Sequence, residues 1–159
     1  MEIEMDRKSQ KLFEDYSLYV EEKNRKTPVS SDELEKMMNL AFNITGKEGG
    51  DISLVVCDND FIAKLNKKYK GRIGPTNVLS FSMREGEFSE LNKDALPLGD
   101  IVISMDKVKE EAEKFGDTVD IVFKHLFIHG VLHLLGYTHN NDDEEEKMNE
   151  LTERIVMGV

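Results

Sequence analysis

The sequence has little of what several classes of protein require. Cys57 is the one cysteine among 159 residues, which excludes a disulfide within the chain and argues against a zinc site built from thiolates. Its position in an apolar run predicts a small buried side chain. No apolar run approaches the roughly 20 residues that cross a bilayer. The first ten residues lack the basic start and apolar stretch of a secretory signal, which predicts a cytoplasmic protein without a membrane partner.

Positive charge is scarce as well. The formal net charge of −11 opposes nonspecific binding to nucleic acid, so any nucleic-acid site must be a local basic patch. The densest patch is the segment KLNKKYKGR, whose members include Lys67, Lys68, Tyr69, Lys70 and Arg72. A tyrosine among cations can stack on a base, as in proteins that bind single strands. The alternative is that these lysines only complement the negative C-terminal end of a helix.

Hydrophobic periodicity predicts helices and strands mixed around one sheet, in a single domain over residues 1–159. The predicted strands are residues 2–6, 52–57, 76–81 and 99–104. The predicted helices are residues 10–24, 31–46, 59–70, 107–115, 118–136 and 141–155. A long hydrophilic loop is expected over residues 84–97. The carboxylates that open the last helix are expected to be a solvated helix start.

All four histidines lie between positions 125 and 139. His129 and His133 are four residues apart, so on a helix their rings project from one face and can chelate one metal ion. A third ligand needs a turn in the chain, because ligand atoms around zinc converge to within about 3.5 Å of one another. Gly136 can end the helix in a left-handed conformation and let His139 return toward the ion. These three histidines are the predicted metal ligands.

The fourth histidine is assigned a structural role. On one helix, His125 and His133 would stand roughly 12 Å apart along the axis. We therefore expect His125 to be hydrogen-bonded to a neighbour or to water instead of binding the ion. Three imidazoles suit zinc, and also nickel, copper or iron. The expected cofactor is thus one zinc ion per chain, with nickel or another transition metal as the alternative.

The histidine spacing also overlays the metzincin protease signature HExxHxxGxxH. One position differs, because Gly130 stands where the protease has its glutamate. That glutamate is the general base that takes the proton from water during peptide attack. Its absence makes a peptidase the weaker interpretation of the site.

Three segments of the chain resemble the YbeY family of bacterial endoribonucleases, from about residue 31 to the C-terminus. The family motif H-G-x-L-H-L-x-G-Y-D-H is matched by residues 129–139, except that Thr138 replaces the aspartate. The block LN..YRG...PT(D/N)VLSF is matched by residues 65–81, with Lys70 in place of the arginine. The block LGDIVIS is unchanged at residues 98–104. Together these segments are far more specific than the histidines alone.

The resemblance implies an α+β fold in which a small mixed four-stranded sheet packs with about five helices, one of them a metal-site helix like that of metzincins. It also implies a zinc-dependent endoribonuclease specific for single-stranded RNA. Its partners would be ribosomal RNA and the small ribosomal subunit, in maturation of the small-subunit RNA 3′ end and in ribosome quality control. No DNA partner is expected.

The resemblance gives roles to the basic segment. Lys70 and Arg72 would position the scissile phosphate and offset its charge in the transition state, and Lys67, Lys68 and Tyr69 would contact the RNA. Lys70 keeps the positive charge of the family's arginine but loses its bidentate fork. The other departure, at Thr138, removes a carboxylate beside the third histidine, so the general base is not identified.

Two other functions remain open from the sequence. A metallopeptidase, or another zinc hydrolase acting on small substrates, is supported by the metzincin spacing. A noncatalytic ribosome-associated protein with a structural metal is supported by the lack of an evident base. For an endoribonuclease, both an activated water and the 2′-hydroxyl of the RNA are possible nucleophiles.

Overall fold

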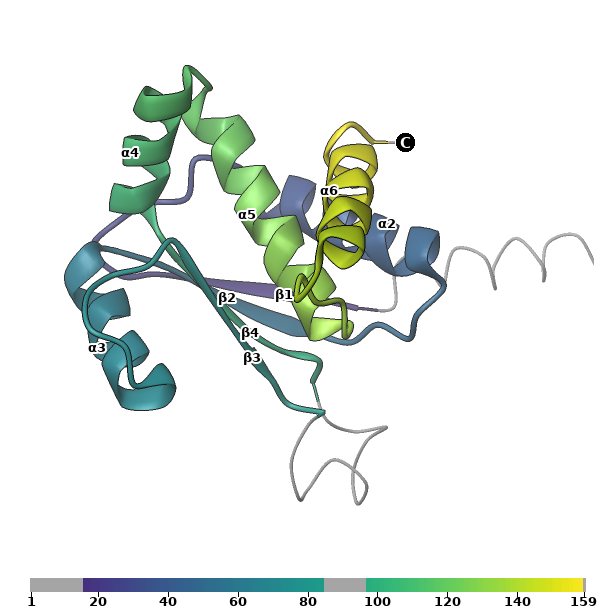
Figure 1. Cartoon of the computed structure of the whole chain (residues 1–159), viewed down its shortest axis with the longest axis horizontal. Coiled ribbons are helices and arrows are strands. Elements are labelled where there is room, and N and C mark those ends of the chain that lie inside the picture. Colours follow the sequence, from purple (N-terminus) through teal and green to yellow (C-terminus); the bar gives the residue numbers. More distant parts are fainter. Residues whose placement is uncertain (1–15, 85–96, 159) are drawn as a thin grey trace, which may run out of the picture.

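The structure is a computed structural model that describes residues 16–84 and 97–158. A four-stranded sheet forms its centre (Figure 1). The strands are β1 (Leu18–Glu22), β2 (Ile52–Cys57), β3 (Val78–Ser82) and β4 (Gly99–Ser104). Their order in the sheet is β1-β2-β4-β3. Strands β1, β2 and β4 are parallel, whereas β3 is antiparallel to β4 and forms one edge of the sheet.

Five helices surround the sheet within the described residues. They are α2 (Ser31–Thr45), α3 (Asn59–Lys70), α4 (Met105–Phe115), α5 (Val119–Leu134) and α6 (Asp142–Val156). Helices α2, α5 and α6 lie together over one face of the sheet, and α3 lies on the other side (Figure 1). The predicted α+β fold, with a mixed four-stranded sheet and about five helices, is confirmed.

Alternating side chains of the strands fill two separate cores. Ile52 and Leu54 of β2 belong to the larger core, on the side of α2, α5 and α6. Cys57, on the opposite face, packs with Ile62 of α3 in the smaller core. Burial raises the pKa of the Cys57 thiol to about 12, so the side chain stays protonated and inert. The predicted small buried cysteine is confirmed.

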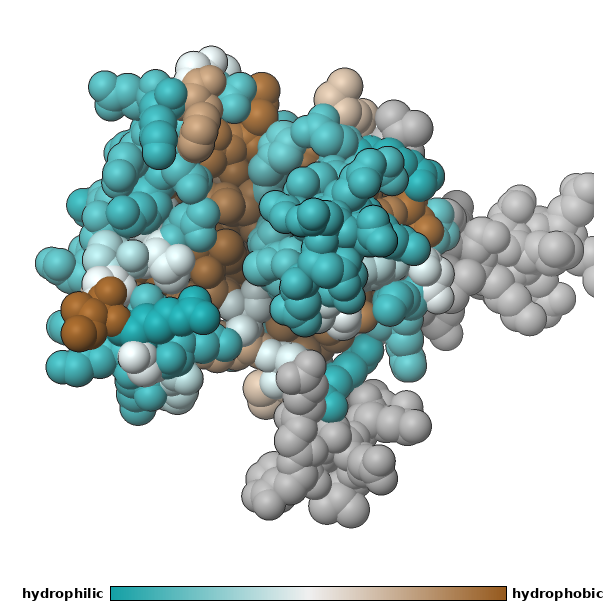
Figure 2. All heavy atoms as spheres, viewed as in Figure 1, coloured by the Kyte–Doolittle hydropathy of each residue, from teal (hydrophilic) through white to brown (hydrophobic). Residues whose placement is uncertain are grey.

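Helix α5 is apolar on nearly all its faces, and this fixes its position. Its buried members include Phe123, Phe127, Ile128, Val131 and Leu132. Figure 2 shows a hydrophobic strip that follows α5 between the hydrophilic surfaces of α4 and α6. On the inner side, a Cβ atom added to Gly130 would lie 3.1 Å from two side-chain carbons of Ile101 in β4. The glycine therefore allows α5 to lie close against the sheet.

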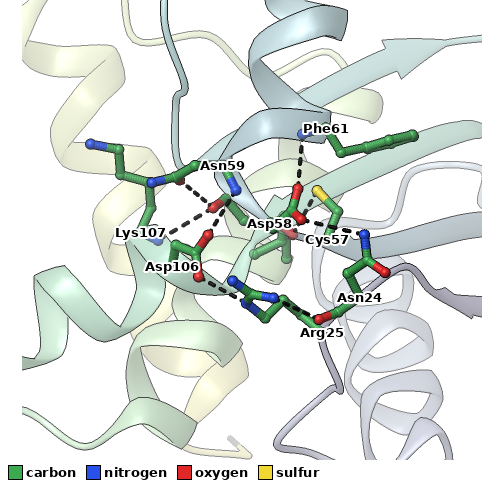
Figure 3. A network of polar contacts seen from close by, with 10 residues as sticks. Asn24, Arg25, Cys57, Asp58, Asn59, Phe61, Asp106 and Lys107 are labelled. Atoms are coloured by element: carbon green, nitrogen blue, oxygen red, sulfur yellow. Dashed lines mark hydrogen bonds and ion pairs between the residues drawn. The ribbon is translucent and has the colours of Figure 1, made fainter.

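A polar network joins the beginnings of α3 and α4 beyond the ends of β2 and β4 (Figure 3). The carboxylate of Asp106 accepts hydrogen bonds from Arg25 Nε at 2.9 Å and from the backbone N–H of Asn59 at 2.8 Å. Ser104 Oγ donates to Asn59 Oδ1 at 2.7 Å. These bonds fix the start of α3, the helix whose far end carries Lys70, relative to the sheet.

One secondary-structure prediction is wrong. Within the predicted helix over residues 10–24, the structure has strand β1, whose residues pair in register from Leu18 with Ile52 to Glu22 with Val56. Leu18 is buried, whereas Tyr19 is 60% exposed, which is the alternation of a strand. Pairing with the free edge of β2 therefore outweighs the helical spacing of the apolar residues.

Several boundaries also differ from the predictions. The strand predicted over 76–81 is Val78–Ser82, the helix predicted from Lys107 begins at Met105, and α5 ends at Leu134 instead of Gly136. The predicted strand over residues 2–6, the first part of the predicted helix over 10–24 and nearly all of the loop predicted over 84–97 lie outside the described residues.

Candidate metal centre

The last two turns of α5 hold two of the predicted ligands. His129 and His133 point their rings toward the same space, with their Nε2 atoms 2.9 Å apart. The helix that carries them begins at a Thr118 cap, whose hydroxyl accepts a hydrogen bond from the N–H of Ile121. Packing of α5 on both sides therefore fixes the two rings through the backbone.

The chain turns back directly after α5, as the glycine predicted. Gly136 has φ +101°, a conformation that L side chains rarely adopt. The turn brings the ring of His139 to within 5.0 Å of the His133 ring and 5.5 Å of the His129 ring, measured between centroids. One ligand nitrogen from each of the three histidines then lies within 4.8 Å of the others. The structure brings the three together, and their binding of a metal stays a prediction.

The tautomer of His133 suits a metal ligand. Its Nδ1 lies 2.9 Å from the backbone carbonyl oxygen of Tyr137. A carbonyl oxygen can only accept, so Nδ1 carries the hydrogen and Nε2 presents a lone pair toward His129. This second hydrogen bond also fixes the ring, as is usual for histidines that bind metals. The donor set therefore fits a transition metal such as zinc.

The environment of His129 and His133 keeps both imidazoles in the neutral form. Burial, followed by the neighbouring His133 and His139, lowers the pKa of His129 from 6.5 to about 4. Burial is also the main cause that lowers the pKa of His133, where the nearby Lys70 contributes in the same direction. Neutral imidazole is the form that binds metal. Both rings are thus ready to bind an ion at neutral pH without first losing a proton.

Acid is expected to destabilise the metal-free protein between about pH 6.5 and pH 4. In this window His129 is protonated in the unfolded chain, where its pKa is near 6.5, and neutral in the folded chain, where its pKa is about 4. The unfolded state then binds more protons, so stability falls as the pH falls. Allowing for the partial exposure of the ring, we expect His129 to contribute a loss of about 2 kcal/mol.

Urea unfolding of EDTA-treated protein, followed by circular dichroism at several pH values, measures this loss. The matched control is His129→Asn, which removes this titrating group and should reduce the pH dependence across the window, leaving the smaller part that His133 contributes. An unchanged dependence in this variant would show that other groups cause the acid destabilisation.

The histidines line a cleft of about 570 Å³ beside the edge strand β3. Its lining residues are Lys70, Arg72, Asn77, Val78, Leu79, Ser80, Phe81, Ser82, His129, His133, Leu134 and His139. Lys70 at the end of α3 and Arg72 in the next loop therefore lie in the same cleft as the predicted ligands. The cleft combines the three predicted metal ligands with two positively charged side chains.

The other predicted RNA-binding residues lie outside the cleft lining. The described residues that line the cleft do not include Lys67, Lys68 or Tyr69. Tyr69 is 57% exposed, and its ring contacts that of Phe81 edge to face, with centroids 5.5 Å apart. Lys70 Nζ lies 5.1 Å from the same Phe81 ring. Tyr69 thus continues the cleft surface outward by one aromatic ring.

Sequence reasoning missed the contribution of β3. The segment was interpreted as a strand and as part of the family block, without a role in the site, yet Asn77, Ser80 and Ser82 are among the residues that line the cleft. Two serines at alternate positions of an otherwise apolar strand lie on one face. This spacing was the available signal that one face of the strand is polar.

His125 has the structural role that was expected. Its Nδ1 lies 2.8 Å from the carbonyl oxygen of Ile121, and its Nε2 lies 2.7 Å from Glu153 Oε1 of α6. Both ring nitrogens are occupied by these contacts. The side chain therefore ties α5 to α6 away from the three clustered histidines.

Comparison with known proteins gives one consistent family. The family model described as Endoribonuclease YbeY matches residues 19–159. A protein named Endoribonuclease YbeY from Bacillus licheniformis is 40% identical over 121 residues, which cover 73% of this chain and 77% of the relative. One from Syntrophus aciditrophicus is 38% identical over 138 residues, which cover 86% of this chain and 85% of the relative. One from Sulfurovum sp. is 43% identical over 118 residues, which cover 74% of this chain and 78% of the relative.

A solved structure supports the fold. The solution structure of TM1509 from Thermotoga maritima matches with a TM-score of 0.56 and 26% sequence identity, over 87% of this chain and 89% of that protein. In the part of the chain that the structure describes, we find no helix both long and apolar enough to cross a membrane.

Proposed function

Because this chain belongs to the YbeY family of endoribonucleases, we propose that it is a metal-dependent endoribonuclease that acts on single-stranded ribosomal RNA. The observation that carries the proposal is the cleft in which His129, His133 and His139 lie with Lys70 and Arg72. Maturation of the small-subunit RNA 3′ end and ribosome quality control are the proposed processes, with the small ribosomal subunit as partner and the cytoplasm as the compartment.

The three histidines are the proposed ligands of one zinc ion per chain. When bound, zinc supplies a Lewis acid that makes a potent nucleophile available at neutral pH. The protein contributes the neutral imidazoles of His129 and His133, and the ring of His133 is held by the Tyr137 carbonyl. Nickel, copper and iron also accept three imidazoles, so elemental analysis of the purified protein identifies the metal.

The cations of the cleft are proposed to act on the scissile phosphate. Lys70 and Arg72 place two positive charges beside the clustered histidines, where they can orient the phosphate and stabilise charge that develops in the transition state. The Tyr69 and Phe81 rings, in edge contact, offer an aromatic surface for a base next to this phosphate. Lys67 and Lys68 lie beyond the cleft lining and are proposed to hold the RNA backbone further along.

The identity of the nucleophile distinguishes two versions of the reaction. Attack by water leaves no cyclic product, whereas attack by the 2′-hydroxyl of the RNA itself forms a 2′,3′-cyclic phosphate. We propose water as the nucleophile. End-group analysis of the cleavage products tests this version, and a 2′,3′-cyclic phosphate would exclude it.

The peptidase alternative is weakened by the position of Gly130. Metzincins carry their general base at this point of the motif, but here the residue packs on Ile101 of β4. A larger side chain here would press on the Ile101 side chain, which would have to shift by a few tenths of an ångström. The alternative of a noncatalytic protein with a structural metal does not explain why two cations share the cleft with the histidines.

We expect the zinc-loaded protein to cleave a single-stranded RNA that contains the small-subunit 3′ end. The same RNA in a duplex, and DNA of the same sequence, should stay intact, because the proposed activity is specific for single-stranded RNA. Gel analysis of end-labelled substrates, with casein as a second substrate, measures this. Cleavage of casein but not of RNA would favour the peptidase. If the protein leaves the RNA intact and also unfolds when the metal is removed, a structural role of the metal would be favoured.

A further inference from the structure

The third histidine of the cluster is held differently from the other two. His129 and His133 project from α5, whose packing fixes them. His139 is exposed and lies in the short connection between the end of α5 at Leu134 and the start of α6 at Asp142. The ligand nitrogens are separated by up to 4.8 Å, against about 3.5 Å around a bound zinc ion. Since the Nε2 atoms of His129 and His133 are only 2.9 Å apart, the position of His139 decides whether the site can close.

One carboxylate binds this connection on both sides of His139. Glu144 Oε1 accepts a hydrogen bond from the Thr138 hydroxyl and another from the backbone N–H of Asn140, the latter at 3.2 Å. Its Oε2 accepts from Asn141 Nδ2 at 3.2 Å. The two residues bonded to Oε1 are the immediate neighbours of His139 in the chain. Glu144 therefore fixes the backbone that carries the third histidine.

The carboxylate itself stands on a rigid support. Glu144 lies in the first turn of α6, where Asn141 Oδ1 caps the helix by accepting from the Glu144 N–H at 2.9 Å. Met148 and Ile155 bury the inner face of α6 in the main core. Hydrogen bonding, most strongly from Thr138, lowers the pKa of the Glu144 carboxyl. An ionised acceptor makes stronger hydrogen bonds than a neutral one.

We propose that Glu144 is a positioning residue of the metal centre, which holds His139 in place through its bonds to Thr138 and Asn140 and thereby raises metal affinity. The proposal depends on the proposed function only in taking the three histidines as ligands. It concerns binding of the ion and does not require that the protein cleave RNA.

The test is the zinc affinity of the full chain, measured by competition with a chelating dye. We expect Glu144→Ala to weaken zinc binding by about tenfold, the lower range for residues that orient a ligand. Glu144→Gln should stay within about threefold of the parent, because its amide oxygen can still accept from Thr138 and Asn140. The control is Glu145→Ala, which removes the same charge from the same exposed helix turn and should leave zinc affinity unchanged.

A double variant separates positioning from a general loss of stability. In a His139→Ala background, Glu144→Ala should cause no further loss of zinc affinity, because no ligand remains for it to position. A further tenfold loss there would overturn the proposal. So would equal affinities of Glu144→Ala and Glu145→Ala, or a Glu144→Gln variant as weak as Glu144→Ala. If the parent protein binds zinc but leaves RNA intact, the proposed function fails while this test still applies.

Discussion

Replacing His133 by alanine is expected to abolish RNA cleavage and to lower zinc affinity by at least about a hundredfold. The side chain has two functions at once. Its Nε2 faces His129 Nε2 at 2.9 Å, and its Nδ1 is held by the Tyr137 carbonyl at 2.9 Å. Alanine removes a ligand nitrogen and leaves that carbonyl without its partner, which costs about 1 kcal/mol of folding stability. Elemental analysis of the purified variant measures the loss of bound metal, and the RNA cleavage assay measures the loss of activity.

The matched control for this experiment is on the same helix. His125→Ala removes an imidazole whose contacts are Ile121 and Glu153, and it should keep full metal content and activity. Circular dichroism establishes that each variant is folded. Should His133→Ala fail to fold, His139→Ala tests the same site from the exposed turn. Parent-level metal content in a folded His133→Ala or His139→Ala variant would show that the ion binds elsewhere.

Replacing Lys70 by alanine is expected to slow RNA cleavage by about a hundredfold, without changing metal content. Lys70 lines the cleft with the histidines, and its charge is close enough to lower the pKa of His133. Removal of one group that stabilises developing charge typically costs a factor of about 100 to 1,000 in rate. Single-turnover cleavage of a labelled RNA, with zinc content measured in parallel, gives the magnitude.

Two further variants define what Lys70 contributes. Lys70→Arg should retain the parent rate or exceed it, because the guanidinium can grip a phosphate with two parallel hydrogen bonds. Lys64→Ala removes the same charge from an exposed position earlier in α3 and should have a small effect. If Lys64→Ala and Lys70→Ala slow cleavage equally, the cluster acts only through its overall charge.

The parts of the fold that the sequence predicted well are those where local preference and packing agree. The run ISLVVC is buried in the middle of the sheet as β2, and α3 ends at Gly71 in the left-handed conformation. Strand β1 could not be predicted in this way, because its partner Ile52 is 34 residues from Leu18. The apolar residues of segment 10–24 fit a helix equally well, and only a neighbour distant in the chain decides between helix and strand.

The same distinction holds at the site. The i, i+4 histidines and the glycine turn predict from the sequence that three imidazoles lie together. Glu144 could not be recognised, because the acidic run that begins α6 looks like an ordinary solvated helix start. Its contact with Thr138 depends on how the connection between α5 and α6 turns. The polar face of β3 was hidden in the same way, since a strand pattern does not say what lies beside its edge.

The position of β3 at the edge of the sheet lets it line the cleft, but it also creates a risk of aggregation. Among residues 16–84 and 97–158, β3 pairs only with β4, and a strand paired on one side has free N–H and C=O groups that can recruit a strand from another molecule and begin aggregation. Proteins usually cover such an edge with a helix or loop, but covering this one would also obstruct the cleft that β3 lines. Two features reduce the hazard here: β3 has only five residues, and two of them are serines. An edge kept open for a substrate must remain short and polar, so substitutions that make β3 longer or more apolar should reduce solubility before they affect catalysis.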